Sequence, residues 1–170
     1  TGLAQVPQKA LESRFIVGTR VDATSYGDAV DRCMSWAREG ESRYVCVSTV
    51  HMVMEGHDSP AYQHVVNSAD LVTPDGVPLV WALRWLGIKG VTRVYGPELT
   101  PQLLKKAADR RIPVGFFGGG TQAALDRLVS IVQERFPHLV ITYAYAPPFH
   151  PLSPDEDETI VREITDSGAR

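Results

Sequence analysis

The sequence predicts an α/β protein with a mostly parallel sheet that is covered by helices on both faces. Short segments typical of strands alternate with longer segments whose apolar residues recur at helical spacing. The strand segments are apolar throughout rather than at every second position, which is typical of strands buried on both faces. In such a Rossmann-like sheet, ligands bind beyond the carboxyl ends of the strands.

The predicted elements follow one another in a regular order. We expect strands at 14–21, 44–47, 71–72, 112–117 and 139–145, and helices at 24–38, 50–55, 60–68, 77–86, 97–110 and 121–136, with a last helix from Pro154. Gly40 and Gly87 are expected to end the helices that precede them. Ser153, with Glu156 three residues later, predicts a capping box at the start of the last helix.

Size and charge exclude several classes of protein. The chain has 170 residues, of which 44% are hydrophobic and 22% charged, which fits one globular domain at 14–170 after a loose lead-in at 1–13. A net charge of −3 argues against a broad basic face for nucleic acid. The sequence shows neither an apolar run of membrane-spanning length nor an export signal, so we expect a soluble, cytoplasmic protein with Cys33 and Cys46 as reduced thiols.

Candidate chemistry lies just after the predicted strands. Asp75 could act as a general base on a hydroxyl, although Pro-Asp-Gly is also a plain turn in which the carboxylate only caps the next helix. Gly118, Gly119 and Gly120 precede a helix, so their N–H groups could hold a diphosphate; a tight turn would explain them equally well. No acidic residue near Tyr143 could hold a ribose, which disfavours a nicotinamide dinucleotide.

Other polar and aromatic residues allow simpler interpretations. Arg93 could neutralise a phosphate or a leaving group, or it could be a solvated surface charge. His51, His57 and His64 have no common metal-ligand spacing, and the acidic run 155–158 fits the first turn of a capped helix, so no metal site is expected. Trp81 and Trp85, four residues apart, are expected in the core rather than in a platform for sugar stacking.

Three motifs taken together resemble one family. They are ADLVTPDGVPLVW at 69–81, RVYGPEL at 93–99 and FFGGG at 116–120. In order and spacing they are similar to the WecG/TagA/CpsF glycosyltransferases of bacterial surface-polysaccharide synthesis, and the resemblance covers nearly all of the chain after about Arg14. It implies an inverting, metal-independent transferase without a cofactor. Such an enzyme moves a sugar from a UDP-sugar to a polyprenyl-diphosphate-linked saccharide in exopolysaccharide, capsule or wall-polymer synthesis.

The resemblance also implies roles for individual residues. Asp75 matches the family's general base, and Arg93 matches the arginine that stabilises the diphosphate or leaving group. Substrate-binding residues are expected at the strand ends and glycine turns: Ser48, Thr49, His51, Thr73, Gly76, Gly96, Gly118, Gly119, Gly120 and Thr121. The sequence departs from the family where many members have Thr-x-Asn, at 47–49, and has Glu98 where Asp is usual. The family continues with another strand and a G-x-P-x-Q-E segment, so we expect this domain to lack the family's C-terminal segment.

Two other functions stay open at this point. The chain could bind a nucleotide-sugar without catalysis if the C-terminal segment completes the site, and a longer chain would then regain activity. A nucleotide-dependent enzyme such as a dehydrogenase would instead bind a dinucleotide. A lipid-linked acceptor implies peripheral contact with the inner face of the cell membrane, while the sugar, the acceptor and any oligomerisation stay undefined.

Overall fold

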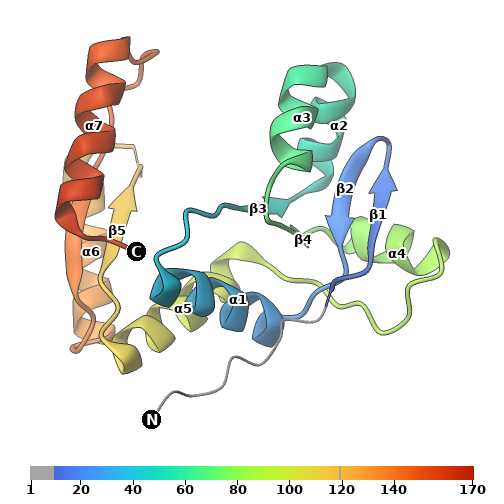
Figure 1. The fold of residues 1–170 in the computed structure, drawn as a ribbon, viewed down its shortest axis with the longest axis horizontal. Coiled ribbons are helices and arrows are strands. Elements are labelled where there is room, and N and C mark those ends of the chain that lie inside the picture. The colour runs from blue at the N-terminus through green and yellow to red at the C-terminus, as the bar shows by residue number, and fades with distance from the viewer. Residues whose placement is uncertain (1–9, 119) are drawn as a thin grey trace. The chain divides into compact units, whose positions relative to one another are not determined.

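The computed structural model describes residues 10–118 and 120–170 and confirms the α/β class (Figure 1). In chain order the elements are β1 (Ser13–Ile16), β2 (Thr19–Asp22), α1 (Tyr26–Glu39), β3 (Val45–Ser48), α2 (Val50–Asp58), α3 (Pro60–Asn67), β4 (Leu71–Pro74), α4 (Val77–Trp85), α5 (Gly96–Arg110), β5 (Val114–Phe117), α6 (Gln122–Arg135), β6 (Ile141–Tyr145) and α7 (Pro154–Ser167).

Contacts within the chain define two compact units. Unit 1 comprises residues 1–36 and 41–100, and unit 2 comprises residues 37–40 and 101–170. The expectation of a single domain at 14–170 stays a prediction. Most of the predicted lead-in lies outside the described residues, and its last residue, Ser13, already belongs to β1.

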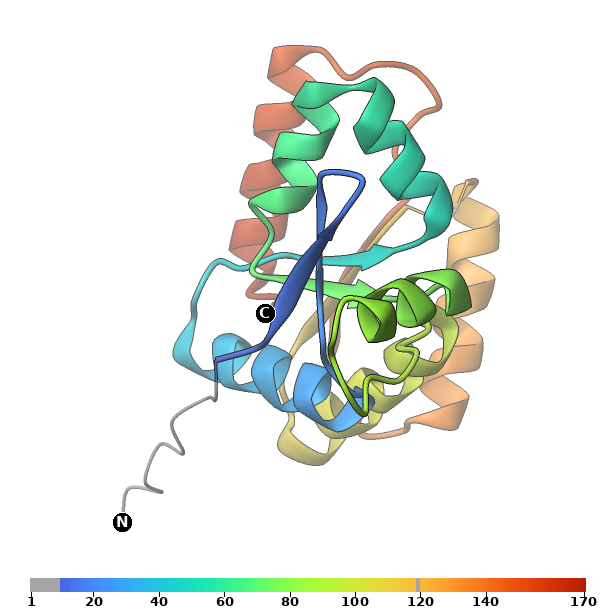
Figure 2. The same cartoon turned by 90° about the vertical axis from the view of Figure 1, so that its right-hand side faces the viewer.

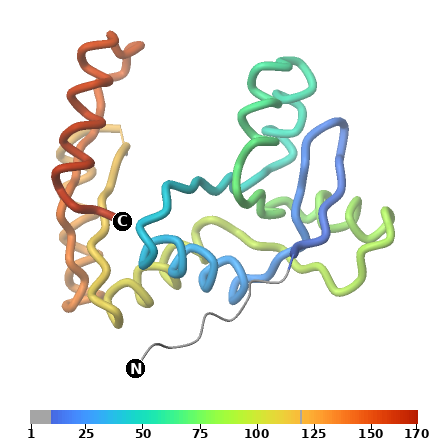
Figure 3. Tube along the Cα trace, viewed as in Figure 1, coloured from blue at the N-terminus to red at the C-terminus, as the bar shows by residue number. Residues whose placement is uncertain are grey.

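The single strand predicted at 14–21 is wrong, because the chain folds back on itself there (Figure 3). β1 pairs antiparallel with β2, from Ser13 opposite Asp22 to Ile16 opposite Thr19. Val17 and Gly18 form the turn with φ values of 49° and 83°. A two-residue turn with both φ values positive matches the right-handed twist of a hairpin. The sequence hides this turn because a β-branched residue such as Val17 rarely adopts a positive φ.

Two parallel strand pairs confirm the parallel character of the prediction. In unit 1, β3 pairs with β4, and in unit 2, β5 pairs with β6, with a register shift between Val114 and Gly115. Neighbouring parallel strands need a long crossover connection. Helices α2 and α3 form it between β3 and β4, and α6 forms it between β5 and β6 (Figure 2). Each unit therefore contains one strand–helix–strand crossover.

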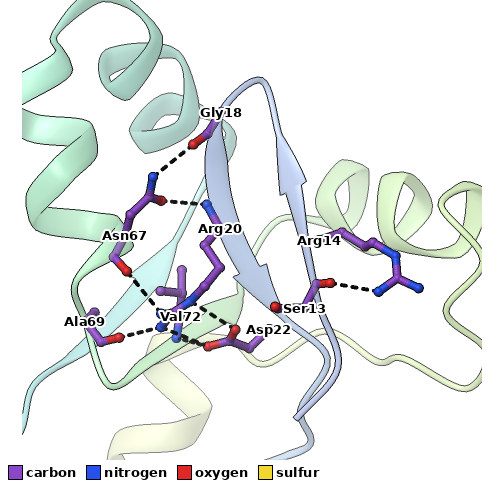
Figure 4. Close-up of polar contacts among 8 residues, drawn as sticks. All are labelled: Ser13, Arg14, Gly18, Arg20, Asp22, Asn67, Ala69 and Val72. Atoms are coloured by element: carbon purple, nitrogen blue, oxygen red, sulfur yellow. Dashed lines mark hydrogen bonds and ion pairs between the residues drawn. The ribbon is translucent and has the colours of Figure 1, made fainter.

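A buried polar cluster attaches the hairpin to β4 (Figure 4). The Asp22 carboxylate accepts a hydrogen bond from the Val72 N–H at 2.8 Å, and the Arg20 Nε lies 3.2 Å from the other Asp22 oxygen. Arg20 also donates to the carbonyls of Asn67, at 3.0 Å, and Ala69. Burial raises the pKa of Asp22, and the contacts with Val72 and Arg20 oppose that shift.

Each unit has an apolar core of its own. In unit 1, one cluster of buried side chains contains Val21, Val80, Leu83, Ile88 and Val91, and another contains Val66, Ala69 and Val72. In unit 2, a cluster of buried side chains contains Leu104, Ala107, Ala108, Val132 and Leu139. β4 is buried at every position, as its sequence predicts.

The expectation that Trp81 and Trp85 lie in the core is wrong, because both are exposed. The buried face of α4 is formed by Leu79, Val80 and Leu83 instead. Spacing alone placed the two tryptophans on one face of the helix but could not show which face is buried. Among residues 10–118 and 120–170, no helix has the length and apolar character needed to cross a membrane.

Candidate functional site

The carboxyl ends of β3 and β4 lie next to each other in unit 1. Ser48 is opposite Pro74 in the parallel register, and the Asp75 N–H donates a hydrogen bond to the Ser48 carbonyl at 2.9 Å. The segments that follow the two strands therefore leave from the same edge, as the sequence predicts. Thr73, one residue before the end of β4, is buried, and its hydroxyl donates to the Val94 carbonyl at 3.5 Å.

Asp75 and Arg93 form an ion pair at this edge. The Arg93 Nη2 lies 2.9 Å from Asp75 Oδ1, and the Arg93 Nε donates to the Asp75 carbonyl. The segment that carries Arg93 is held against β4 because the Val94 N–H donates to the Pro74 carbonyl at 2.9 Å. The Asp75 side chain is 11% exposed, whereas that of Arg93 is 44% exposed. Asp75 Oδ2 and Arg93 Nη1 make no hydrogen bond to another described residue.

The interpretation of Asp75 as a simple helix cap is wrong. The N-cap of α4 is Gly76, and no side chain caps that position. The carboxylate turns to Arg93 instead, so an ionic contact between distant parts of unit 1 holds it. This leaves a carboxylate and a guanidinium in direct contact at a strand end, where a hydroxyl and an anionic group could both be bound.

Two tyrosines that the sequence did not single out support Arg93. The guanidinium carbon lies 4.1 Å from the centroid of the Tyr95 ring, a cation–π contact. The Tyr26 hydroxyl accepts from the Tyr95 N–H at 3.0 Å and donates to a Glu98 carboxylate oxygen at 2.7 Å. Burial and the Glu98 hydrogen bond raise the pKa of Tyr26. Because Tyr26 and Tyr95 are 69 residues apart, no local spacing could signal their contact.

Three predicted binding residues at the end of β3 and just after it have different surroundings from one another. The Ser48 hydroxyl is buried and has no hydrogen-bond partner among the described residues. Thr49 caps α2, accepting from the Met52 N–H at 3.2 Å. The side chain of His51 is 86% exposed, and its Nε2 lies 3.8 Å from a Glu55 oxygen. Their contacts with substrate stay predictions.

The predicted glycines also differ in their surroundings. Gly96 begins α5, and a Cβ there would be 3.5 Å from a Val47 methyl, an ordinary contact. In unit 2, Gly118 and Gly120 have φ values of 112° and 84°, which favour glycine over other residues. Gly119 lies outside the described residues. Thr121 caps α6 by accepting a hydrogen bond from the Ala124 N–H at 3.2 Å. Backbone geometry thus explains two glycines of this turn, and its role in binding stays a prediction.

The acidic run lies at the start of α7, where Ser153 and Glu156 form the predicted capping box. The Ser153 N–H donates to the Glu156 carboxylate at 2.8 Å, and the Glu156 N–H donates to the Ser153 hydroxyl at 3.3 Å. Nowhere in 10–118 and 120–170 do three or more His, Cys, Asp or Glu side chains gather as metal ligands would. Independence from metal stays a prediction.

The fold and this site define an α/β protein in which a carboxylate and a guanidinium form an ion pair at the carboxyl end of a parallel strand. Residues 14–170 match the family described as "Glycosyl transferase WecG/TagA/CpsF family", and the chain belongs to this family. The match confirms the resemblance seen in the three motifs.

A curated relative is similar over part of its length. It is an N-acetylglucosaminyldiphosphoundecaprenol N-acetyl-beta-D-mannosaminyltransferase of Bacillus spizizenii, 26% identical over 103 residues. The aligned region covers 61% of this chain and 40% of the relative, so the chain spans less than half of that protein.

Proposed function

We propose that the protein transfers a sugar from a UDP-sugar to a hydroxyl of a polyprenyl-diphosphate-linked saccharide, with inversion and without a metal ion. Family membership supports the transfer of a sugar. The name of the relative supports the acceptor, because it describes a transferase that acts on a lipid-diphosphate-linked N-acetylglucosamine. The observation that carries the proposal is the Asp75–Arg93 pair, which supplies a base for a hydroxyl and a cation for a diphosphate in one site.

In the proposed reaction, Asp75 acts as the general base. Its Oδ2 accepts the proton of the acceptor hydroxyl while Oδ1 stays paired with Arg93. The acceptor oxygen attacks the anomeric carbon from the face opposite UDP, so the new C–O bond forms as the bond to the diphosphate breaks. The configuration at that carbon is inverted, and the acceptor proton ends on Asp75.

Arg93 has two tasks in this mechanism. Its Nε and Nη2 hold Asp75, and its Nη1, which bonds no other described residue, binds the diphosphate, where negative charge develops as UDP leaves. Tyr95 lies against the guanidinium and orients it through the cation–π contact. In unit 2, we propose that the N–H groups at the start of α6 donate hydrogen bonds to an anionic ligand bound at the turn before that helix.

Calorimetric titration with UDP, with NAD as the control ligand, tests the donor site. We expect saturable binding of UDP and none of NAD. Binding of NAD without UDP would contradict the proposal and favour a dinucleotide enzyme. Binding of UDP without any sugar transfer by the unaltered protein would instead favour a nucleotide-sugar-binding protein without catalysis.

Transfer assays with a short-chain, water-soluble diphosphate acceptor test the roles of the pair. Asp75→Asn keeps the shape of the side chain but removes the base, so transfer should fall by about a hundredfold or more while UDP still binds. Arg93→Gln should weaken UDP binding. The matched control is Asp70→Asn, which removes a carboxylate that is paired with Arg43 at 2.7 Å. Normal transfer by Asp75→Asn would show that Asp75 is not the base.

A further inference from the structure

Helix α4 has an apolar face that no part of the described structure covers. Val77, Trp81 and Trp85 follow one another at four-residue intervals and are 43%, 55% and 88% exposed. Side chains at this spacing are neighbours on a helix surface, and Leu86, the C-cap of the helix, is exposed as well. Two exposed tryptophans in such a row exceed the scattered apolar residues of an ordinary surface and indicate an interaction site.

The stretch of sequence that contains α4 carries only positive charges, between Asp75 and Glu98. Residues 76–97 contain Arg84, Lys89 and Arg93 but no Asp or Glu, although the whole chain carries a net charge of −3. Arg84 and Lys89 are exposed. The Arg84 Nη2 donates to the Val91 carbonyl at 3.0 Å, which keeps the guanidinium near the end of α4. Tryptophan together with Arg and Lys is the combination found where proteins meet the headgroup region of an anionic bilayer.

The position of α4 connects this face with the proposed site. Gly76, the N-cap of α4, directly follows Asp75, so the exposed face begins two residues from the proposed base. An acceptor carried on a polyprenyl tail presents its diphosphate at the surface of a bilayer. An enzyme that acts on it without extracting the tail must bring its base to that surface.

We propose that the exposed face of α4 binds an anionic lipid bilayer, with Trp81 and Trp85 inserted at the level of the headgroups. The choice of a lipid surface rests on the proposed function, because the lipid-linked acceptor makes a bilayer the relevant partner. The binding itself is measured without any sugar transfer. Arg84 and Lys89 provide the electrostatic attraction, and the indole rings provide the apolar contact.

Co-sedimentation with vesicles tests this surface. We expect the protein to bind vesicles of phosphatidylcholine and phosphatidylglycerol, to bind pure phosphatidylcholine less well, and to be released by salt. Trp81→Ser combined with Trp85→Ser should reduce binding at least tenfold, and Arg84→Gln or Lys89→Gln should each reduce it about fivefold. Phe149→Ser, which alters another exposed aromatic residue, is the matched control and should bind as the unaltered protein does.

Three results would overturn the proposal. They are no binding of the unaltered protein to anionic vesicles, equal binding by the double tryptophan variant, and equal loss of binding in Phe149→Ser. The molar mass by light scattering is a further check: if the double variant changes the oligomeric state and leaves vesicle binding intact, the face joins copies of the chain and the proposal is wrong.

Two acceptors separate this proposal from the proposed function. The double tryptophan variant should transfer sugar normally to the short-chain acceptor in solution and poorly to a long-chain acceptor in vesicles. Normal transfer to the vesicle-bound acceptor by this variant would contradict docking through α4 and leave the glycosyltransferase proposal intact. Vesicle binding without transfer to either acceptor by the unaltered protein would contradict the glycosyltransferase proposal and leave the docking surface intact.

Discussion

The substitution Tyr26→Phe tests whether the contacts behind Arg93 matter. It removes only the hydroxyl, which accepts from the Tyr95 N–H at 3.0 Å and donates to Glu98 at 2.7 Å. The first bond contributes about 1 kcal/mol and the second, to an exposed carboxylate that water can solvate, about 0.5 kcal/mol. We therefore expect the free energy of unfolding to fall by about 1.5 kcal/mol, which lowers the Tm by about 3 to 6 °C.

The same substitution should weaken UDP binding without touching the ligand. Tyr95 loses the bond that fixes its backbone, and its ring lies against the Arg93 guanidinium. A less restrained guanidinium loses more rotational freedom when it binds a diphosphate, so we expect UDP to bind about three- to tenfold more weakly. Urea unfolding measures the first effect, and calorimetric titration with UDP measures the second.

Tyr44→Phe is the matched control for this experiment. The Tyr44 hydroxyl donates to the Val65 carbonyl at 2.7 Å, elsewhere in unit 1. Its loss should lower stability by about 1 kcal/mol and leave UDP binding unchanged. If Tyr26→Phe loses stability but binds UDP as tightly as Tyr44→Phe does, Tyr26 does not position Arg93 and the reasoning is refuted.

Three further predictions concern other residues. Burial would raise the pKa of Asp70, but the Tyr44 N–H and the Arg43 guanidinium outweigh it and lower that pKa, so the stability that Asp70 contributes is present at neutral pH and is lost as the pH falls through the lowered pKa. Asp70→Asn should therefore unfold at lower urea concentration than the unaltered protein at pH 7, and this difference should shrink as the pH falls. Burial raises the pKa of Cys33 to about 11, so about one thiol in a thousand is ionised at pH 8. Cys33 should therefore react with iodoacetamide at least a hundredfold more slowly than free cysteine, and similar rates would contradict its burial. Gly18→Ala should cost about 1–2 kcal/mol in urea unfolding because of the positive φ, and an unchanged midpoint would contradict the hairpin turn.

The sequence predicted the crossover units well because their signals are local. A buried apolar strand, a capped helix and a glycine-rich turn each depend on neighbouring residues, as the capping box at Ser153 illustrates. The hairpin was missed because Val17 is a poor turn residue on sequence grounds alone, and its positive φ is set by pairing between β1 and β2. The burial of α4 was misjudged because its two faces are both apolar, so periodicity could not identify the face that meets the core.

In the candidate site, too, local sequence signals predicted the residues but not their tertiary contacts. Asp75 and Arg93 were identified because their motifs are specific in combination, and the parallel register then places Ser48 beside the turn at Asp75. Their direct contact is a tertiary feature, as is the support from Tyr26, and no spacing in the sequence encodes either. The turn alone favoured a cap for Asp75. Only the backbone position of Gly76 and the direction of the carboxylate decide against it.

The Asp75–Arg93 pair has a chemical consequence beyond its geometry. A carboxylate that is 11% exposed would repel an incoming diphosphate if it stood alone, because a poorly hydrated environment screens like charges weakly. Arg93 cancels that charge, and its Nη1 makes no hydrogen bond to another described residue, which leaves a donor that a lysine could not offer while holding two oxygens of Asp75. In the proposed mechanism, the arginine thus lets a base and a diphosphate occupy one site. The structure is consistent with this requirement, because the Tyr95 ring lies against the arginine rather than the carboxylate, and Tyr26 bonds the Tyr95 backbone.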